Sequence, residues 1–85
     1  MVRERKAYRR VWARFPRDFP KRLDRLRDEL GLSWLRLARC LGARPATVYQ
    51  WRRGQKPGPA YLMALFELAT NTESGVDLLL RPASE

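Results

Sequence analysis

The segment spanning residues 32–54 constrains the fold of this chain more than any other part of it. Apolar residues recur in it at helical spacing on both sides of Gly42. These apolar positions are Leu37, Ala38 and Leu41 before the glycine, and Val48 and Trp51 after it. The spacing predicts two short helices, 34–41 and 45–52, joined by a tight turn at Gly42. Neither helix is long enough to be stable alone, so both must pack against further helices.

The second of these helices leaves one side of its surface without core positions. The side chains expected on that outer side are Arg44, Pro45, Ala46, Tyr49, Gln50 and Arg53. Two short helices joined by a turn form the outline of a helix-turn-helix, whose second helix enters the major groove of DNA. The pattern therefore favours a chain that reads DNA with residues 45–52.

Length and composition exclude several other classes of protein. The 85 residues suffice for one small hydrophobic core, so we expect a single domain. The chain has no histidine and a single cysteine, Cys40, which leaves little for a metal site, a disulfide or general base catalysis. It has no run of about 18 apolar residues and no secretory signal. We therefore expect a cytoplasmic protein with no membrane partner, no enzymatic activity, no metal and no cofactor.

Basic residues outnumber acidic residues by 18 to 9, and the excess lies in one part of the chain. Residues 1–56 hold 17 basic and 5 acidic side chains, whereas residues 57–85 hold one arginine and 4 acidic side chains. A field of this strength attracts polyanions such as nucleic acid. Arginine-rich composition with solvated helix faces is the alternative explanation for the excess, but it explains the segregation less well.

Residues 1–17 combine dense positive charge with an apolar stripe. The large apolar side chains follow the i, i+3, i+4, i+7 spacing of one side of a helix. They are Tyr8, Val11, Trp12 and Phe15. We predict a helix over about 5–15 that packs on the domain, with a flexible basic arm as the alternative. The arginines expected on the solvent side of this segment are Arg3, Arg9, Arg10 and Arg14.

Proline, glycine and capping residues predict the ends of the remaining helices. Asp18 is positioned to cap a helix that runs to about Leu30 and is ended by Gly31. Ser33 is the expected cap of the next helix, and Pro59 is the expected first residue of another.

A last short helix is predicted at about 76–80, and no segment alternates in the manner of a strand. The chain is therefore predicted to be all-α. Its expected divisions are a basic, aromatic N-terminal arm or helix at 1–17, a helix-turn-helix domain at 18–81 and a C-terminal tail at 82–85.

Three sequence blocks occur in a characteristic order over about residues 19–80. They read LRDELGLSWLRLARCLG, then ARPATVYQWRRG, then a helix of the form PxxxYLMALFELA followed by VDLLL. In this order and spacing they resemble the lambda-repressor-like, Xre-type helix-turn-helix family of bacterial and phage regulators. The resemblance implies a compact five-helix bundle in which the helix 45–52 lies in the major groove.

The resemblance also implies roles for individual side chains. The residues that match the base-reading positions are Arg44, Pro45, Ala46, Tyr49 and Gln50. The residues expected at phosphates are Ser33, Trp34, Thr47, Arg52, Arg53 and Lys56, together with Arg9, Arg10 and Arg14 of the N-terminal segment. Gln50 is the main candidate for direct readout, because its amide can both donate to and accept from the N6/N7 edge of adenine.

Three residues depart from the family pattern toward charge or bulk. Arg44 replaces the usual Ser or Thr cap, and it either contacts a phosphate or guanine or stays solvated as a poor cap. Trp34 replaces a common glutamine, and its indole either donates to a phosphate or packs against Trp12 or Tyr8. Arg52 replaces a common acidic residue and is expected to bind phosphate.

Two functional hypotheses follow from the sequence. The first is a sequence-specific transcriptional regulator, in its simplest form a repressor, that binds double-stranded DNA. One helix-turn-helix reads only a half-site, so a homodimer on a palindromic operator is expected, joined through Leu78, Leu79 and Leu80 or through the N-terminal segment. The second is a protein-interaction module, such as an antitoxin or a phage accessory factor, whose basic face binds an acidic protein. The positive charge taken alone would also fit RNA binding.

Overall fold

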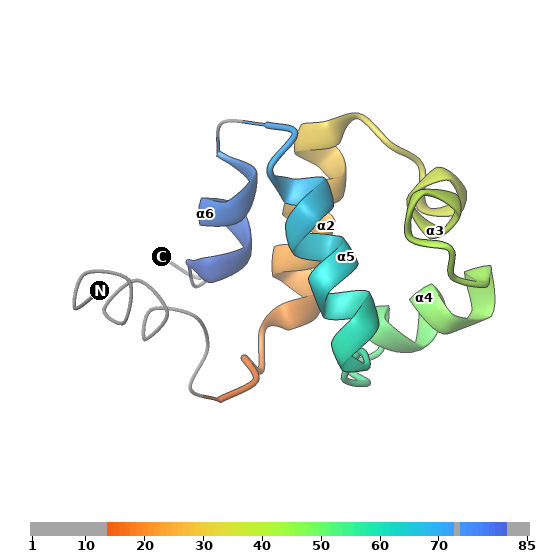
Figure 1. Cartoon of the computed structure of the whole chain (residues 1–85). Helices are drawn as coiled ribbons and strands as arrows, with labels where there is room; N and C mark the ends of the chain where they lie inside the picture. The colour runs from red at the N-terminus through yellow and green to blue at the C-terminus, as the bar shows by residue number, and fades with distance from the viewer. Residues whose placement is uncertain (1–13, 73, 82–85) are drawn as a thin grey trace.

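The structure, a computed structural model, describes residues 14–72 and 74–81, and the secondary structure in that part is helical (Figure 1). Its five helices are α2 (Phe19–Leu30), α3 (Trp34–Leu41), α4 (Pro45–Arg52), α5 (Pro59–Ala69) and α6 (Gly75–Leu80). The all-α prediction is confirmed for the described residues, and so are the predicted bounds 34–41 and 45–52. No helix in this part of the chain is long and apolar enough to cross a lipid bilayer.

The helix predicted over about 5–15 lies mostly outside the described residues. Its expected last two positions, Arg14 and Phe15, are described and are not helical. Pro16 follows them, and a proline disfavours helical conformation in the residue before it. The Phe15 ring packs on Phe19 instead, with 4.8 Å between the ring centroids.

The main contacts between the helices form a closed cycle around one core. α2 packs against α6 and α4, α5 packs against α6 and α3, and α3 packs against α4. Figure 1 shows α6 on one side of α2 and α5, with α3 and α4 on the other side. The buried apolar side chains at the centre are Phe19, Leu23, Leu26, Leu37, Ala38, Leu41, Val48, Trp51, Leu65, Ala69 and Leu79. Every helix contributes to this list, so removing any one of them would open the core.

The two turns that flank α3 are closed by glycine, as predicted. Gly31 and Gly42 have φ of 69° and 68°, in the left-handed region that other residues rarely adopt. The N–H of the residue after each glycine donates to the carbonyl five residues earlier, at 3.1 and 2.9 Å, which is the Schellman arrangement. The Ser33 Oγ accepts from the Arg36 N–H at 3.1 Å, so the predicted cap of α3 is confirmed. Both ends of α3 are therefore fixed by local bonds.

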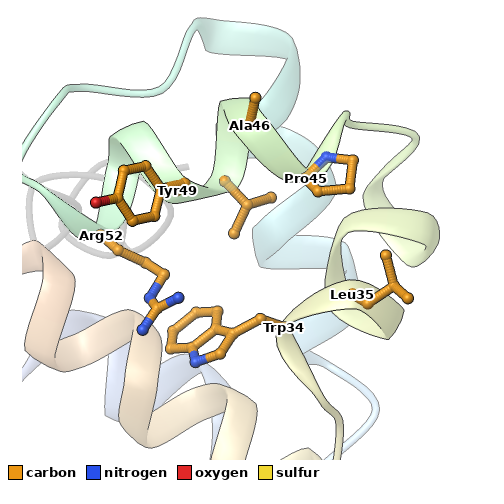
Figure 2. A pocket seen from close by; sticks show the side chains of 7 residues that line it. Trp34, Leu35, Pro45, Ala46, Tyr49 and Arg52 are labelled. Carbon is orange, nitrogen blue, oxygen red and sulfur yellow. The ribbon is translucent and has the colours of Figure 1, made fainter.

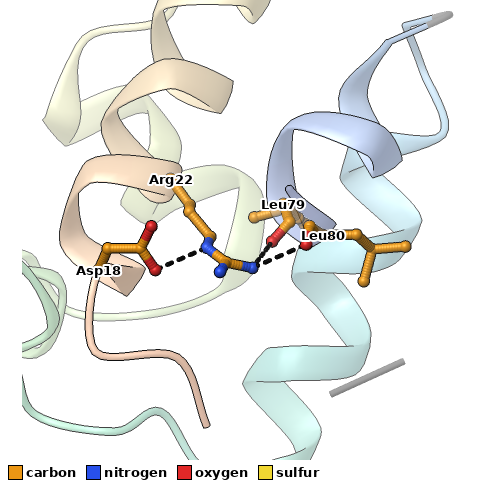
Figure 3. A network of polar contacts seen from close by, with 4 residues as sticks. All are labelled: Asp18, Arg22, Leu79 and Leu80. Carbon is orange, nitrogen blue, oxygen red and sulfur yellow. Dashed lines mark hydrogen bonds and ion pairs between the residues drawn. The ribbon is translucent and has the colours of Figure 1, made fainter. Parts of the chain in front are cut away.

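The start of α2 is joined to the end of α6 by Arg22 (Figure 3). We predicted that Asp18 caps α2, but its side chain makes no cap bond and accepts from the Arg22 Nε at 2.8 Å. The Arg22 Nη1 donates to the carbonyls of Leu79 and Leu80, each at 2.9 Å. Carbonyls in the last turn of a helix lack partners within the helix, so this arginine supplies the missing donors. Only 7% of Arg22 is exposed.

The interface predicted at Leu78, Leu79 and Leu80 is wrong for its middle residue. Leu79 is 0% exposed and belongs to the core of the bundle, so it is not available to a second copy. Consecutive residues of a helix point about 100° apart, and only one of three can face the core directly. Leu78 and Leu80 are half-buried and remain partly on the surface.

Arg22→Leu is expected to lower the free energy of unfolding by about 2–4 kcal/mol. The variant leaves the Asp18 carboxylate without this arginine and removes the donor to the carbonyls of Leu79 and Leu80. Urea unfolding followed by circular dichroism measures the change. Arg25→Leu, at an exposed position of the same helix, is the control and is expected to stay within about 0.5 kcal/mol of the parent. Equal unfolding midpoints for the two variants would contradict this role of Arg22.

Candidate nucleic-acid interface

The outer face of α4 carries the residues predicted to read bases. These exposed residues are Arg44, Pro45, Ala46, Tyr49 and Gln50. The face is set by Val48 and Trp51, which are buried in the core and thereby fix the rotation of the helix. Arg44 stands before the first turn in extended conformation, and its side chain makes no cap bond. The predicted exposure is confirmed, and the role of these residues at bases stays a prediction.

The residues predicted at phosphates come from the start of α3, from α4 and the loop after it, and from the segment before α2. Those that are exposed are Arg14, Ser33, Arg52, Arg53 and Lys56, whereas Trp34 and Thr47 are half-buried. The Ser33 oxygen accepts the cap bond of α3, so its own proton is what it could offer to a phosphate. Arg9 and Arg10 lie outside the described residues.

Trp34 lies in a cation–π cluster that the sequence did not predict. The guanidinium carbons of Arg52 and Arg27 lie 4.2 and 4.9 Å from the centroid of its ring. Figure 2 shows the Arg52 guanidinium beside the indole. Trp12 and Tyr8, the packing partners that we gave as the alternative to a phosphate contact, lie outside the described part of the chain. The indole is thus the point at which α2, α3 and α4 meet.

The two arginines at this ring differ in their other partners. Arg27 donates to the Asp24 carboxylate from Nε at 3.1 Å and from Nη2 at 2.8 Å, and its Nη1 donates to the Leu32 carbonyl at 2.7 Å. Within residues 14–72 and 74–81, no carboxylate pairs with Arg52. Arg52 is therefore positioned by the aromatic ring while its charge stays available to an anion.

Aromatic side chains also position the basic residues that follow α4. The Arg53 Nη1 donates to the Tyr49 hydroxyl oxygen at 3.4 Å, and its guanidinium carbon lies 5.8 Å from the Tyr49 ring centroid. The Lys56 Nζ lies 5.8 Å from the ring centroid of Phe15. Lys56 therefore connects the loop after α4 to the start of the described chain.

A groove of about 380 Å³ lies between the first turn of α3 and one side of α4 (Figure 2). Its lining residues are Trp34, Leu35, Pro45, Ala46, Val48, Tyr49 and Arg52. Leu35, which is 48% exposed, is the member that sequence reasoning missed. The sequence did indicate it, because Leu35 is a large apolar residue that lies outside the buried stripe of α3.

Negative charge is absent from the whole middle of the chain. No Asp or Glu occurs between Glu29 and Glu67. The basic residues of this stretch are Arg36, Arg39, Arg44, Arg52, Arg53 and Lys56. In the described residues none of the six takes part in an ion pair, so their fields add rather than cancel.

Comparisons of the chain with known protein families, with curated proteins and with solved structures found no match. The resemblance to the lambda-repressor-like family therefore stays a prediction, based on the sequence blocks and their order. The described residues establish a helical pair, α3 and α4, with a basic outer surface and a groove between the two helices.

A double-mutant cycle between Trp34→Leu and Arg52→Gln is expected to give a coupling of about 0.5–1 kcal/mol in the free energy of unfolding, the usual range for a cation–π pair near solvent. Urea unfolding of the two single variants and the double variant measures it. A second cycle that pairs Trp34→Leu with Arg36→Gln is the control and should show no coupling, because no ring contact joins those residues. Additive effects in the first cycle would overturn the assigned contact.

Proposed function

We propose that this chain is a sequence-specific double-stranded DNA-binding protein that inserts α4 into the major groove and acts as a transcriptional regulator, in its simplest form a repressor. The observation that carries the proposal is the outer face of α4. This face presents exposed polar and small side chains amid basic residues that lack ion-pair partners in the described part of the chain. A major groove about 12 Å wide admits a helix, and unpaired arginines gain most when they meet phosphates.

The side chains on and after α4 have different proposed roles at the DNA. Gln50 is exposed and its amide suits the N6/N7 edge of adenine, so it is the proposed reader of sequence. Arg44, at the start of α4, is the proposed second contact, to guanine or to a phosphate. Arg52, Arg53 and Lys56 bind the phosphate backbone of the DNA and thereby set the position of α4 in the major groove.

A homodimer on a palindromic operator belongs to the same proposal, because one recognition helix covers only a half-site. Leu78 and Leu80, half-buried on α6, are the residues that remain from the interface suggested by the sequence. The lambda-repressor-like, Xre-type family is the class of regulator that best fits this arrangement.

A second candidate function, a protein-interaction module such as an antitoxin, is suggested by one exposed apolar side chain of α5. Met63 on that helix is 70% exposed. A stoichiometric complex with a protein, together with no shift of any DNA duplex in a mobility assay, would favour this function over DNA binding.

DNA binding by this surface is expected to weaken steeply with salt. If about 6–10 phosphates are neutralised, the affinity should fall by about 10³ to 10⁵ between 50 and 200 mM monovalent salt. Fluorescence anisotropy of a labelled duplex, titrated with the protein at several salt concentrations, measures the slope. A flat salt response would refute the proposal.

The variants Gln50→Ala and Arg53→Ala are expected to weaken DNA binding in different ways. Gln50→Ala should reduce the preference at one base pair, at a cost of about 1–3 kcal/mol on the selected sequence only. Arg53→Ala should weaken binding to all sequences alike and reduce the magnitude of the salt slope by about one. Binding to a duplex selected from a random library and to a scrambled duplex separates the two effects. Arg81→Ala, at the residue that follows α6, is the control for lost charge. Equal losses on both duplexes for Gln50→Ala would count against its assignment.

A further inference from the structure

The groove between α3 and α4 is apolar, although the surface around it is basic. Leu35 and Tyr49 are 48% and 50% exposed, and they come from different helices to line the same hollow. Figure 2 shows their side chains, with Ala46 and Pro45, arranged around it. Exposed large apolar side chains that share one hollow are typical of a surface that binds a partner. The occupant must therefore present an apolar group.

The charge around the groove restricts the occupant further. Arg52 lies on its edge without a carboxylate partner in the described residues, and no acidic residue lines the groove. Asp24, which lines a second hollow with Trp34 and Arg52, is paired with Arg27. An anionic occupant is favoured by such a surface, and a cationic one is repelled. The groove thus fits a polyanion that carries small apolar projections.

Double-stranded DNA has one such projection in its major groove, the 5-methyl group of thymine. RNA does not present it, because uracil lacks this methyl group and the major groove of an RNA helix is too narrow for side chains to read. Ala46 and Tyr49 belong to the same exposed side of α4 that carries the proposed base-reading residues. A thymine edge that faces α4 would therefore meet this groove.

We propose that the groove binds the 5-methyl edge of thymine, with Leu35, Ala46 and Tyr49 as the residues that contact the methyl group. The inference rests on the proposed DNA binding and adds a base preference to it, one that hydrogen bonding by Gln50 does not supply. Removal of one buried methyl group weakens binding by about fourfold, on the usual scale for apolar surface taken out of water.

The test compares two duplexes that differ only in this methyl group. One is the duplex selected from the random library, and the other has the same sequence with deoxyuridine in place of thymidine. The full chain should bind the thymine duplex about threefold to fivefold more tightly at equal salt, as measured by anisotropy.

The variants Leu35→Ser and Leu35→Ser/Tyr49→Ser should bring the ratio of the two affinities toward one. Both residues are about half exposed, and an unchanged helical circular dichroism spectrum verifies that each variant folds. Met63→Ser, which removes an exposed apolar side chain of α5 outside the groove, is the matched control and should keep the parental ratio.

The outcomes separate this inference from the proposed function. Equal, salt-dependent binding of the two duplexes would overturn methyl recognition and leave DNA binding intact. A ratio that persists in the Leu35→Ser/Tyr49→Ser variant would assign the preference to duplex shape and overturn the role of the groove. Tighter binding of a uracil-bearing RNA duplex would also overturn it. Binding of neither DNA duplex would overturn the proposed function and the inference together.

Discussion

The buried Arg22 guanidinium is the contact on which the arrangement of the bundle depends. α6 has six residues, too few for a helix to be stable alone, and it is held by the burial of Leu79 and by the bonds from Arg22 to its last carbonyls. Those bonds fix α6 to α2, and α2 in turn packs against α4. Toward its other end, α2 carries Arg27, which is bonded to the loop before α3 and lies against the indole of α3. The helix α2 therefore holds α6 on the core at one end and positions the candidate interface at the other.

Much of the fold could be predicted from local sequence. Gly31 and Gly42 determine where helices end, Pro59 determines where one begins, and the burial of Trp51 follows from its place in the apolar stripe. The error at Asp18 arose because one of the groups involved lies far away in the chain. Asp18 has the side chain of a helix cap, but Arg22 competes for the same carboxylate, and the rest of that arginine is directed by α6, more than fifty residues later. Three consecutive leucines do not reveal which of them is buried, because a helix of six residues is too short for its periodicity to be read.

The candidate site also has one part that the sequence predicted and one part that it did not. The exposed side of α4 follows from helical periodicity alone, so its outward residues were predicted correctly as a surface. The cluster at Trp34 and the groove beside Leu35 require α2, α3 and α4 to be placed relative to one another, and spacing along the sequence carries no such information. The family resemblance suggested a phosphate role for Trp34 and gave no role to Arg27. The observed ring contacts make the indole a support for Arg52, which remains at the surface, and the phosphate role of Trp34 stays a prediction.

The surroundings of Trp34 and Trp51 give the molecule two internal optical reporters with separate meanings. Trp51 is 2% exposed and packs against Tyr61 with 5.2 Å between ring centroids, so its emission depends on whether the core is intact. Trp34 is half-buried at the edge of the groove, beside the Arg52 guanidinium, so its emission depends on what occupies that edge. Loss of folding therefore affects both indoles, whereas a ligand that enters the groove affects Trp34. Tryptophan emission would therefore respond to both events without an attached label.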